Sequence, residues 1–307
     1  MLITTSAINS KAEQGKEKFI EESEKQYQER LKKAAEKICL TEQERPLILI
    51  SGPSGSGKTT TAIKLYQTIR SMGHKVCYIS MDRYFKNFSE EEKILKQQNK
   101  IDLESPERVD SEHLNRDLDI LLNGGKIELP AYDFSTNTRR PSGKTIDRQG
   151  GFVILEGIHA LNPDILGDTD SSSTRIYVSV RSRLIDSNGD KLHPCKIRLM
   201  RRMMRDKLYR GRQIEETVRL FPSVQRGENR YILPYKYRSD EDIDTFIPYE
   251  ACVYRDVLFS ELKGIADKYA DIRDIVQGLD EILPISPKLV PGDALLREFI
   301  GDSSLKY

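Results

Sequence analysis

The sequence has little of what marks several protein classes. Of its 307 residues four are cysteine and none is tryptophan. The cysteines at 39, 77, 195 and 252 form no CxxC pair, and no histidine lies close enough to complete a zinc-type spacing. No apolar run approaches the roughly 18 residues that span a bilayer, and the first residues lack the pattern of a secretory signal. We therefore expect a cytoplasmic protein with reduced thiols.

Net charge is also nearly absent. The chain has 49 basic and 48 acidic residues, a formal net charge of +1, which does not indicate a global attraction to nucleic acid or to an anionic membrane. Hydrophobic residues make up 37% and charged residues 32%, enough apolar material for a core beneath a strongly charged surface. We expect a folded chain whose partners are neither nucleic acid nor membrane.

Residues 1–45 are predicted to form a charged N-terminal segment dominated by one helix over residues 9–40. A thin apolar stripe runs along this helix in a field of lysine and glutamate. An amphipathic helix packed on the main body or on a partner is expected, because the stripe is too short and broken for a long coiled coil. The stripe consists of Phe19, Tyr27, Leu31, Ala34 and Ile38.

From Pro46 onward the pattern changes to that of an α/β fold. A short apolar run at 47–51 (LILIS), a helical pattern at 59–71 and a second apolar run at 75–81 suggest a parallel βαβ unit. We predict a mainly parallel sheet flanked by helices in a domain at 46–270, followed by a helical C-terminal extension at 271–307. The other expected elements are strands at 152–155 and 175–180, and helices at 111–122, 196–208, 249–269, 272–283 and 293–300.

Residues 52–59 (GPSGSGKT) match the phosphate-loop pattern G-x-x-x-x-G-K-[ST]. The glycines allow backbone N–H groups to surround phosphate oxygens at the start of the next helix. Lys58 would neutralise the β- and γ-phosphates of ATP, and the Thr59 hydroxyl suits Mg²⁺. The alternative is a glycine-rich turn without a ligand. The predicted ATP-binding residues of this loop are Gly52, Ser54, Gly55, Ser56, Gly57, Lys58, Thr59 and Thr60.

Two carboxylates follow predicted strands. Glu156 directly follows the apolar run at 152–155. A carboxylate at this end of a parallel strand could be a second Mg²⁺ ligand, beside Thr59. Asp82 follows the strand at 75–81 and would emerge at the same edge of the sheet, where it could accept a proton from an attacking hydroxyl. The alternatives are an ordinary loop acid for Glu156 and a helix N-cap or turn residue for Asp82.

Residues 196–212 carry eight basic side chains and one acidic one. Ile197, Met200, Met204 and Leu208 give the predicted helix one apolar face, and Gly211 could act as a hinge. We expect a lid near 196–230 whose arginines neutralise charge on the transferred phosphoryl group and exclude water. A solvated basic face is the alternative, whereas RNA binding is not favoured because the segment lacks a series of interleaved aromatic residues for base stacking.

Two short patterns suggest a GTPase but are misplaced. Residues 99–102 spell NKxD and residues 164–167 spell DxxG. In GTPases the second pattern precedes the first, and NKxD follows a buried strand rather than a polar, helix-like stretch. We therefore reject this reading.

With these motifs in place, the chain resembles the uridine kinase/phosphoribulokinase family over roughly residues 46–260, and is most similar to bacterial uridine-kinase-like nucleoside kinases. Four further segments carry the resemblance. They are residues 79–85 (ISMDRYF), residues 104–106 (ESP) with Asp110, residues 129–134 (LPAYDF) with Arg139, and residues 201–206 (RRMMRD) with the RGR at 210–212.

The resemblance implies a role for each matching residue. Asp82 would be the base or the orienting group for the 5′-hydroxyl, and Glu104 would hold the ribose. Tyr132 and Phe134 would pack around the nucleoside base, with ordinary core packing as the alternative. Asn137 stands where pyrimidine kinases usually have histidine, which leaves uridine, cytidine or another nucleoside open. The implied catalytic residues are Asp82, Lys58 and Arg205; Arg210 and Arg212 would bind ATP; and Asp82, Phe85, Glu104, Tyr132, Phe134, Asn137 and Arg205 would bind the substrate.

The expected activity is transfer of the γ-phosphate of ATP, with Mg²⁺, to the 5′-hydroxyl of a nucleoside. Two alternatives stay open at this point. One is a related kinase of another small alcohol, such as phosphoribulose or pantothenate, and the other is a nucleotide-binding regulator without turnover. The expected partner is a small-molecule nucleoside substrate, and a homo-oligomer is an open alternative to a monomer.

Overall fold

A five-stranded parallel sheet forms the centre of the computed structural model, which describes residues 2–98, 101–167 and 169–306. The strand order is β10-β7-β2-β6-β3, and every neighbouring pair is parallel. This confirms the α/β fold predicted from the sequence. The strands are β2 (Leu47–Ser51), β3 (Val76–Ser80), β6 (Phe152–Glu156), β7 (Ser173–Ser179) and β10 (Glu241–Asp244).

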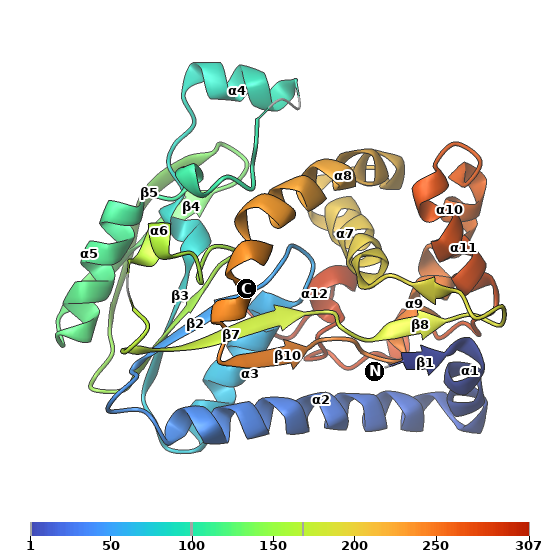
Figure 1. The fold of residues 1–307 in the computed structure, drawn as a ribbon, viewed down its shortest axis with the longest axis horizontal. Coiled ribbons are helices and arrows are strands. Elements are labelled where there is room, and N and C mark those ends of the chain that lie inside the picture. Colours follow the sequence, from blue (N-terminus) through green and yellow to red (C-terminus); the bar gives the residue numbers. More distant parts are fainter. Residues whose placement is uncertain (1, 99–100, 168, 307) are drawn as a thin grey trace.

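Helices cover both faces of this sheet, which explains its continuous apolar strands. Every residue of β2 and β6 is buried. Ile48 and Ile50 of β2 pack into one core cluster with α2 (Lys16–Cys39) and α3 (Lys58–Ser71), whereas Leu47 and Leu49 pack into a second cluster with α5 (Ser111–Leu122). Figure 1 shows α2 along the bottom of the molecule and α5 at its left.

The prediction of one N-terminal helix over residues 9–40 was wrong. The chain forms a short strand β1 (Leu2–Thr4), a helix α1 (Thr5–Gln14) and then α2. Gly15 separates the helices because its φ of 149° is far from the helical value. The apolar stripe of α2 is buried against the body as expected. Strand β1 pairs in parallel with β8 (Arg183–Ile185), which pairs with β9 (Lys191–Leu192).

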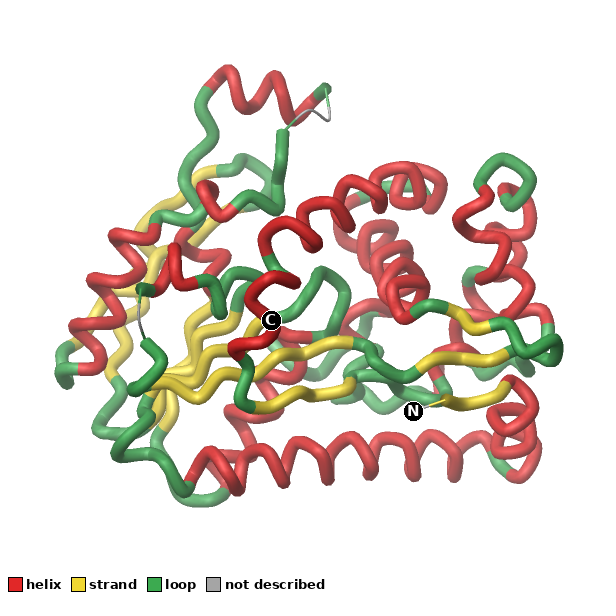
Figure 2. Tube along the Cα trace, in the orientation of Figure 1, coloured by secondary structure: helices red, strands yellow, loops and turns green. Residues whose placement is uncertain are grey.

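An antiparallel hairpin on the far side of β3 was not predicted. It consists of β4 (Lys126–Asp133) and β5 (Thr138–Asp147), which pair only with each other. Most of β5 is exposed, so it lacks the apolar alternation that marks a half-buried strand. The short helices α4 (Glu90–Gln97) and α6 (Pro163–Leu166) lie in the loops around the sheet, and Figure 2 shows α4 projecting from the body.

The predicted lid is a pair of helices, α7 (Pro194–Arg210) and α8 (Ile214–Tyr231), joined at Gly211 with a φ of 64°. The single helix predicted over 249–269 is instead α9 (Glu250–Val257) and α10 (Phe259–Ile265), because the backbone leaves helical geometry at Leu258, with φ −115°. Helices α11 (Arg273–Asp280) and α12 (Arg297–Ile300) both lie within their predicted ranges, 272–283 and 293–300, but are shorter. No described helix is long and apolar enough to cross a membrane.

A fully buried ion pair ties the lid to the body. Arg201 of α7 donates from Nε and Nη2 to the two carboxylate oxygens of Glu250 of α9, each at 2.9 Å, and neither side chain is exposed. Arg201 also donates to the carbonyls of Thr245, at 2.6 Å, and Gly55, at 3.2 Å. The guanidinium thus joins α7, α9 and the loop after β2.

Replacing Glu250 by glutamine should be strongly destabilising, because it leaves the Arg201 charge buried without a counter-ion. We expect Glu250→Gln to lower the free energy of unfolding by about 3–5 kcal/mol. The control is Glu261→Gln, which removes the partner of Lys207 in an exposed pair and should cost less than about 1 kcal/mol. Urea unfolding monitored by circular dichroism measures both. Equal, small losses would show that the buried pair does not hold the lid.

Candidate functional site

The glycine-rich loop connects β2 to α3 at the carboxyl edge of the sheet, in the strand–loop–helix context that the sequence predicts. Gly52, Gly55 and Gly57 adopt φ values of 155°, 75° and 83°, which side-chain-bearing residues rarely adopt. At Gly52 there is also no room: an added Cβ would lie 1.9 Å from the carbonyl oxygen of Val178 in β7. The loop therefore needs glycine here both for its backbone angle and for its close approach to β7.

The carbonyl groups of the loop are bound by residues from outside it. Arg198 of α7 donates to the Ser54 carbonyl at 2.9 Å, and Arg201 donates to that of Gly55, as described above. The hydroxyl of Thr245 donates to the next carbonyl, that of Ser56, at 2.6 Å. A carbonyl held in this way is not free to turn toward a phosphate, which its oxygen would repel.

Lys58 and the two predicted carboxylates lie together at this edge. Glu156 ends β6 and is in register with Ile50 of β2 and Ser80 of β3, so Asp82 follows on the neighbouring strand. Lys58 is buried and donates from Nζ to the carbonyl of Pro53 at 3.2 Å. The three predicted groups are thus brought to adjacent strand ends.

Burial raises the pKa of both carboxyl groups, and for Glu156 the neighbouring Asp82 raises it further. Desolvation raises the pKa of Asp82, and the positive charges of Lys58, Arg210 and Arg205 oppose this, with Lys58 contributing most. Desolvation raises the pKa of Glu156 to about 7; Lys58 lowers it and Asp82 raises it further. The carboxylates therefore compete for one lysine, an arrangement that favours arrival of a further cation.

The basic face of α7 points inward, so the alternative of a solvated face is wrong for its first two turns. Arg198, Arg201 and Arg202 are all buried, with at most 8% of their surface exposed. Of the predicted apolar face, Ile197 and Met200 are buried but Leu208 is 49% exposed. The arginines are buried because they have partners in the glycine-rich loop.

One buried carboxylate, that of Asp206, is shared by four arginines. It has no exposed surface. Burial and the neighbouring guanidinium groups lower the pKa of Arg210 to about 10. The positive charge around Asp206 is only partly compensated, which suits an incoming polyanion. The distances from the Asp206 oxygens are 3.8 Å to Arg202, 3.7 Å to Arg205, 3.1 Å to Arg210 and 3.4 Å to Arg212.

The three predicted aromatic residues form one cluster. Ring centroids are 5.6 Å apart for Phe85 and Tyr132, 5.1 Å for Tyr132 and Phe134, and 6.3 Å for Phe85 and Phe134. All three contacts are edge-to-face, and Phe134 is 57% exposed. The structure thus joins the turn after β3 to the β4–β5 hairpin and presents an aromatic surface at the side of the site.

Asn137 lies in the turn of this hairpin with a φ of 56°. Asparagine is among the residues that tolerate this left-handed conformation best. The backbone conformation alone therefore explains why an asparagine occupies position 137. Its carbonyl accepts a hydrogen bond from the N–H of Phe88 at 3.3 Å.

Glu104 lies under the lid. A Cβ on Gly227 of α8 would be 2.5 Å from the Cβ of Glu104, so the helix can approach this closely only with glycine. Burial raises the pKa of Glu104, whereas the charges of Arg202 and Lys58 lower it. Glu104 therefore belongs to the same electrostatic neighbourhood as the phosphate loop. Asn99 and Lys100 of the NKxD pattern lie outside the described residues.

Two carboxylates in the site were missed by sequence reasoning. The Glu228 carboxylate of α8 accepts hydrogen bonds from two guanidinium nitrogens of Arg198, at 2.6 and 2.9 Å. It also accepts one from the backbone N–H of Ser54, at 3.1 Å. Glu298 of α12 accepts from the N–H and hydroxyl of Thr60. Neither glutamate lies in a recognisable pattern, and their partners are far away in the sequence, so no local signal could have found them.

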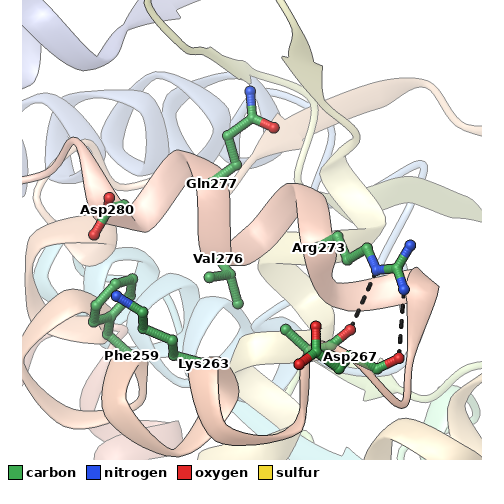
Figure 3. Close-up of a pocket in the computed structure, with 8 residues that line it drawn as sticks. Phe259, Lys263, Asp267, Arg273, Val276, Gln277 and Asp280 are labelled. Carbon is green, nitrogen blue, oxygen red and sulfur yellow. Dashed lines mark hydrogen bonds between the residues drawn. The ribbon is translucent and has the colours of Figure 1, made fainter.

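A surface cavity of about 250 Å³ lies elsewhere, between α10 and α11. Figure 3 shows Phe259 and Lys263 on one side and Arg273 on the other. Arg273 donates to the carbonyls of Ala266 and Asp267, at 3.3 and 3.4 Å, so its guanidinium serves the local backbone. None of the predicted site residues lines this cavity.

Comparison with known proteins gives a consistent result. Residues 47–247 match the model of the phosphoribulokinase/uridine kinase family. The chain is 32% identical over 195 residues to a uridine kinase of Macrococcus caseolyticus, covering 63% of this chain and 85% of that protein. It is 34% identical over 199 residues to a uridine kinase of Staphylococcus carnosus, covering 63% and 84%.

Among solved structures, the chain is similar to a protein of Silicibacter sp. TM1040 described as a candidate fructose transport system kinase. The TM-score is 0.54 at 17% identity, and the match covers 69% of this chain and 98% of that one. At this identity the similarity shows a shared fold.

Gly52→Ala should disable the phosphate loop. The new Cβ would displace either the loop or β7, so we expect ADP affinity to fall by at least about tenfold, as for loss of one hydrogen bond to a charged group. The control is Gly73→Ala, where φ is 94° but no atom lies within 4 Å of the added Cβ. This control should lose about 1–2 kcal/mol of stability and bind ADP normally. Calorimetric titration of both variants with ADP decides; wild-type affinity in Gly52→Ala would contradict the assignment.

Proposed function

We propose a nucleoside kinase, starting from the fact that the chain belongs to the phosphoribulokinase/uridine kinase family and is an ATP-dependent kinase. The reaction we propose is transfer of the γ-phosphate of ATP to the 5′-hydroxyl of a nucleoside, with uridine and cytidine as the first candidates. The observation that carries the proposal is the placement of Asp82, Glu156 and the phosphate loop on three neighbouring strand ends around Lys58. The names of the curated relatives support the choice of acceptor.

In this proposal the phosphate loop and the lid position ATP. Backbone N–H groups of residues 55–60 and the Lys58 ammonium would hold its phosphates. Arg205, Arg210 and Arg212 would neutralise the charge that spreads over the phosphoryl oxygens during transfer. Because phosphoryl transfer needs little covalent help from the protein, positioning and charge compensation would supply most of the catalysis.

Asp82 would act on the acceptor. Asp82 follows β3, and Glu156 ends the neighbouring strand β6. The Asp82 carboxylate would accept the proton of the 5′-hydroxyl as the hydroxyl oxygen attacks the γ-phosphorus. Burial raises the pKa of Asp82, and the charges of Lys58, Arg210 and Arg205 oppose this rise. They thereby favour the ionised carboxylate, which is the form that a base requires.

Thr59 and Glu156 would hold Mg²⁺ together with phosphate oxygens. A hydroxyl and one carboxylate are the hard oxygen ligands that Mg²⁺ takes when substrate phosphates and water complete its coordination. When bound, the ion neutralises phosphate charge. Burial and, to a smaller extent, the charge of Asp82 raise the pKa of Glu156, and a bound cation would stabilise its ionised form.

The nucleoside would lie against the aromatic cluster. Phe85, Tyr132 and Phe134 offer apolar surface for a flat base, and the Glu104 carboxylate would accept hydrogen bonds from ribose hydroxyls. Asn137 at the hairpin turn would contact the base edge.

An acceptor screen tests the proposal directly. Purified protein with ATP, Mg²⁺ and each common nucleoside should phosphorylate uridine or cytidine. Asp82→Asn should lower kcat for that acceptor by about 10²–10⁴-fold, the usual contribution of a general base. The matched control Asp119→Asn, on the exposed face of α5, should turn over as wild type does.

Three results would contradict the proposal. Full activity of Asp82→Asn would show that Asp82 is not the general base. A strong preference for a sugar phosphate or another small alcohol would assign the chain to a different branch of its family. ATP binding without phosphorylation of any acceptor would favour a regulator.

The metal assignment predicts a changed Mg²⁺ requirement. Glu156→Gln should raise the Mg²⁺ concentration for half-maximal activity by at least about tenfold, since even an outer-shell partner of a bound metal has an effect of this size. Glu112→Gln on exposed α5 is the control and should not change it. Steady-state rates over a Mg²⁺ series measure both, and an unchanged requirement in Glu156→Gln would place the metal elsewhere.

A further inference from the structure

Glu298 binds the first turn of the helix that follows the phosphate loop. Its Oε2 accepts hydrogen bonds from the backbone N of Thr60 at 3.1 Å and from the Thr60 hydroxyl at 2.7 Å. Backbone N–H groups in the first turn have no partner within the helix, and in a phosphate loop they are among the groups that hold nucleotide phosphates. The carboxylate thus takes a position suited to a phosphate oxygen.

The segment that carries Glu298 is packed against the loop. Leu295 is fully buried, and a Cβ on Gly57 would lie 2.9 Å from its Cδ1. Phe299 is also fully buried, with the guanidinium of Arg201 5.2 Å from its ring centroid. Figure 1 shows α12 beside α3 and α7. The Glu298 carboxylate is therefore held beside Thr60 by a segment that is packed into the core.

Glu298 also adds negative charge where phosphates would bind. A phosphate oxygen approaching the Thr60 N–H would meet this carboxylate at the same donor. Two like charges at one donor repel each other strongly in a partly buried site, so both cannot remain there.

We propose that Glu298 is an internal competitor of the nucleotide, which occupies the Thr60 N–H until ATP or ADP displaces it. Rotation about the side-chain bonds of Glu298 would move the carboxylate away from this N–H. The apparent dissociation constant of the nucleotide is then its intrinsic value divided by the fraction of molecules in which the carboxylate has moved away. The C-terminal segment would in this way set the nucleotide affinity of the site. The inference rests on the nucleotide site of the proposed function but not on the identity of the acceptor.

The test is calorimetric titration of the full-length chain with Mg²⁺–ADP. Glu298→Gln keeps the shape of the side chain and removes its charge, so we expect ADP to bind about tenfold more tightly than to wild type. Glu298→Asp keeps the charge but shortens the side chain, and should give a smaller gain. The matched control is Asp302→Asn, which removes one negative charge from a side chain that is 95% exposed in the same segment; it should bind ADP as wild type does.

Unchanged or weaker ADP binding in Glu298→Gln would overturn the inference, because Glu298 would then support the loop or contact the nucleotide. If Glu298→Gln does not fold, Glu298→Asp decides in the same way. Failure of the nucleoside screen leaves these outcomes intact, since ADP binding needs no acceptor. Absence of ADP binding in every form of the chain would overturn both this inference and the proposed function.

Discussion

The site depends on the way the protein holds the backbone of its glycine-rich loop. Three successive carbonyl groups, those of residues 54–56, are bound by Arg198, Arg201 and Thr245. Arg201 is itself fixed by the buried carboxylate of Glu250. Glycines make the loop conformation accessible, but these contacts select it. Helix α7, part of the predicted lid, therefore also belongs to the scaffold of the glycine-rich loop.

Charge is the second constraint. Lys58 faces two carboxylates, Asp82 and Glu156, both with raised pKa values, while the arginines around Asp206 carry uncompensated positive charge. Carboxylates with raised pKa values and arginines in excess thus occur in one site, and Arg210 and Arg205 act on the Asp82 carboxyl group itself. A metal–triphosphate complex, with its cation beside the carboxylates and its phosphates beside the arginines, would compensate both charges at once, which is the electrostatic basis of the proposed kinase reaction.

The parts of this picture that the sequence predicts are those encoded locally. The loop pattern, the apolar runs of β2 and β6, and the acids that follow β3 and β6 are contiguous signals, and parallel topology brings their ends together. The break at Gly15 was missed because the amphipathic pattern continues on both sides of it. Strand β5 was missed because it is mostly exposed. The burial of Arg201 was missed because its partner lies 49 residues away, and a pairing over that distance leaves no periodic trace.

The central claim is that Asp82 faces the acceptor hydroxyl across the phosphate loop. A crystal structure with uridine, Mg²⁺ and a non-hydrolysable ATP analogue tests it most directly. The account predicts a carboxylate oxygen of Asp82 about 2.6–3.2 Å from the 5′-hydroxyl, with that hydroxyl in line with the γ-phosphorus and the base against Phe85, Tyr132 and Phe134. A nucleoside whose 5′-hydroxyl is turned away from Asp82, or an analogue bound outside the loop, would contradict it.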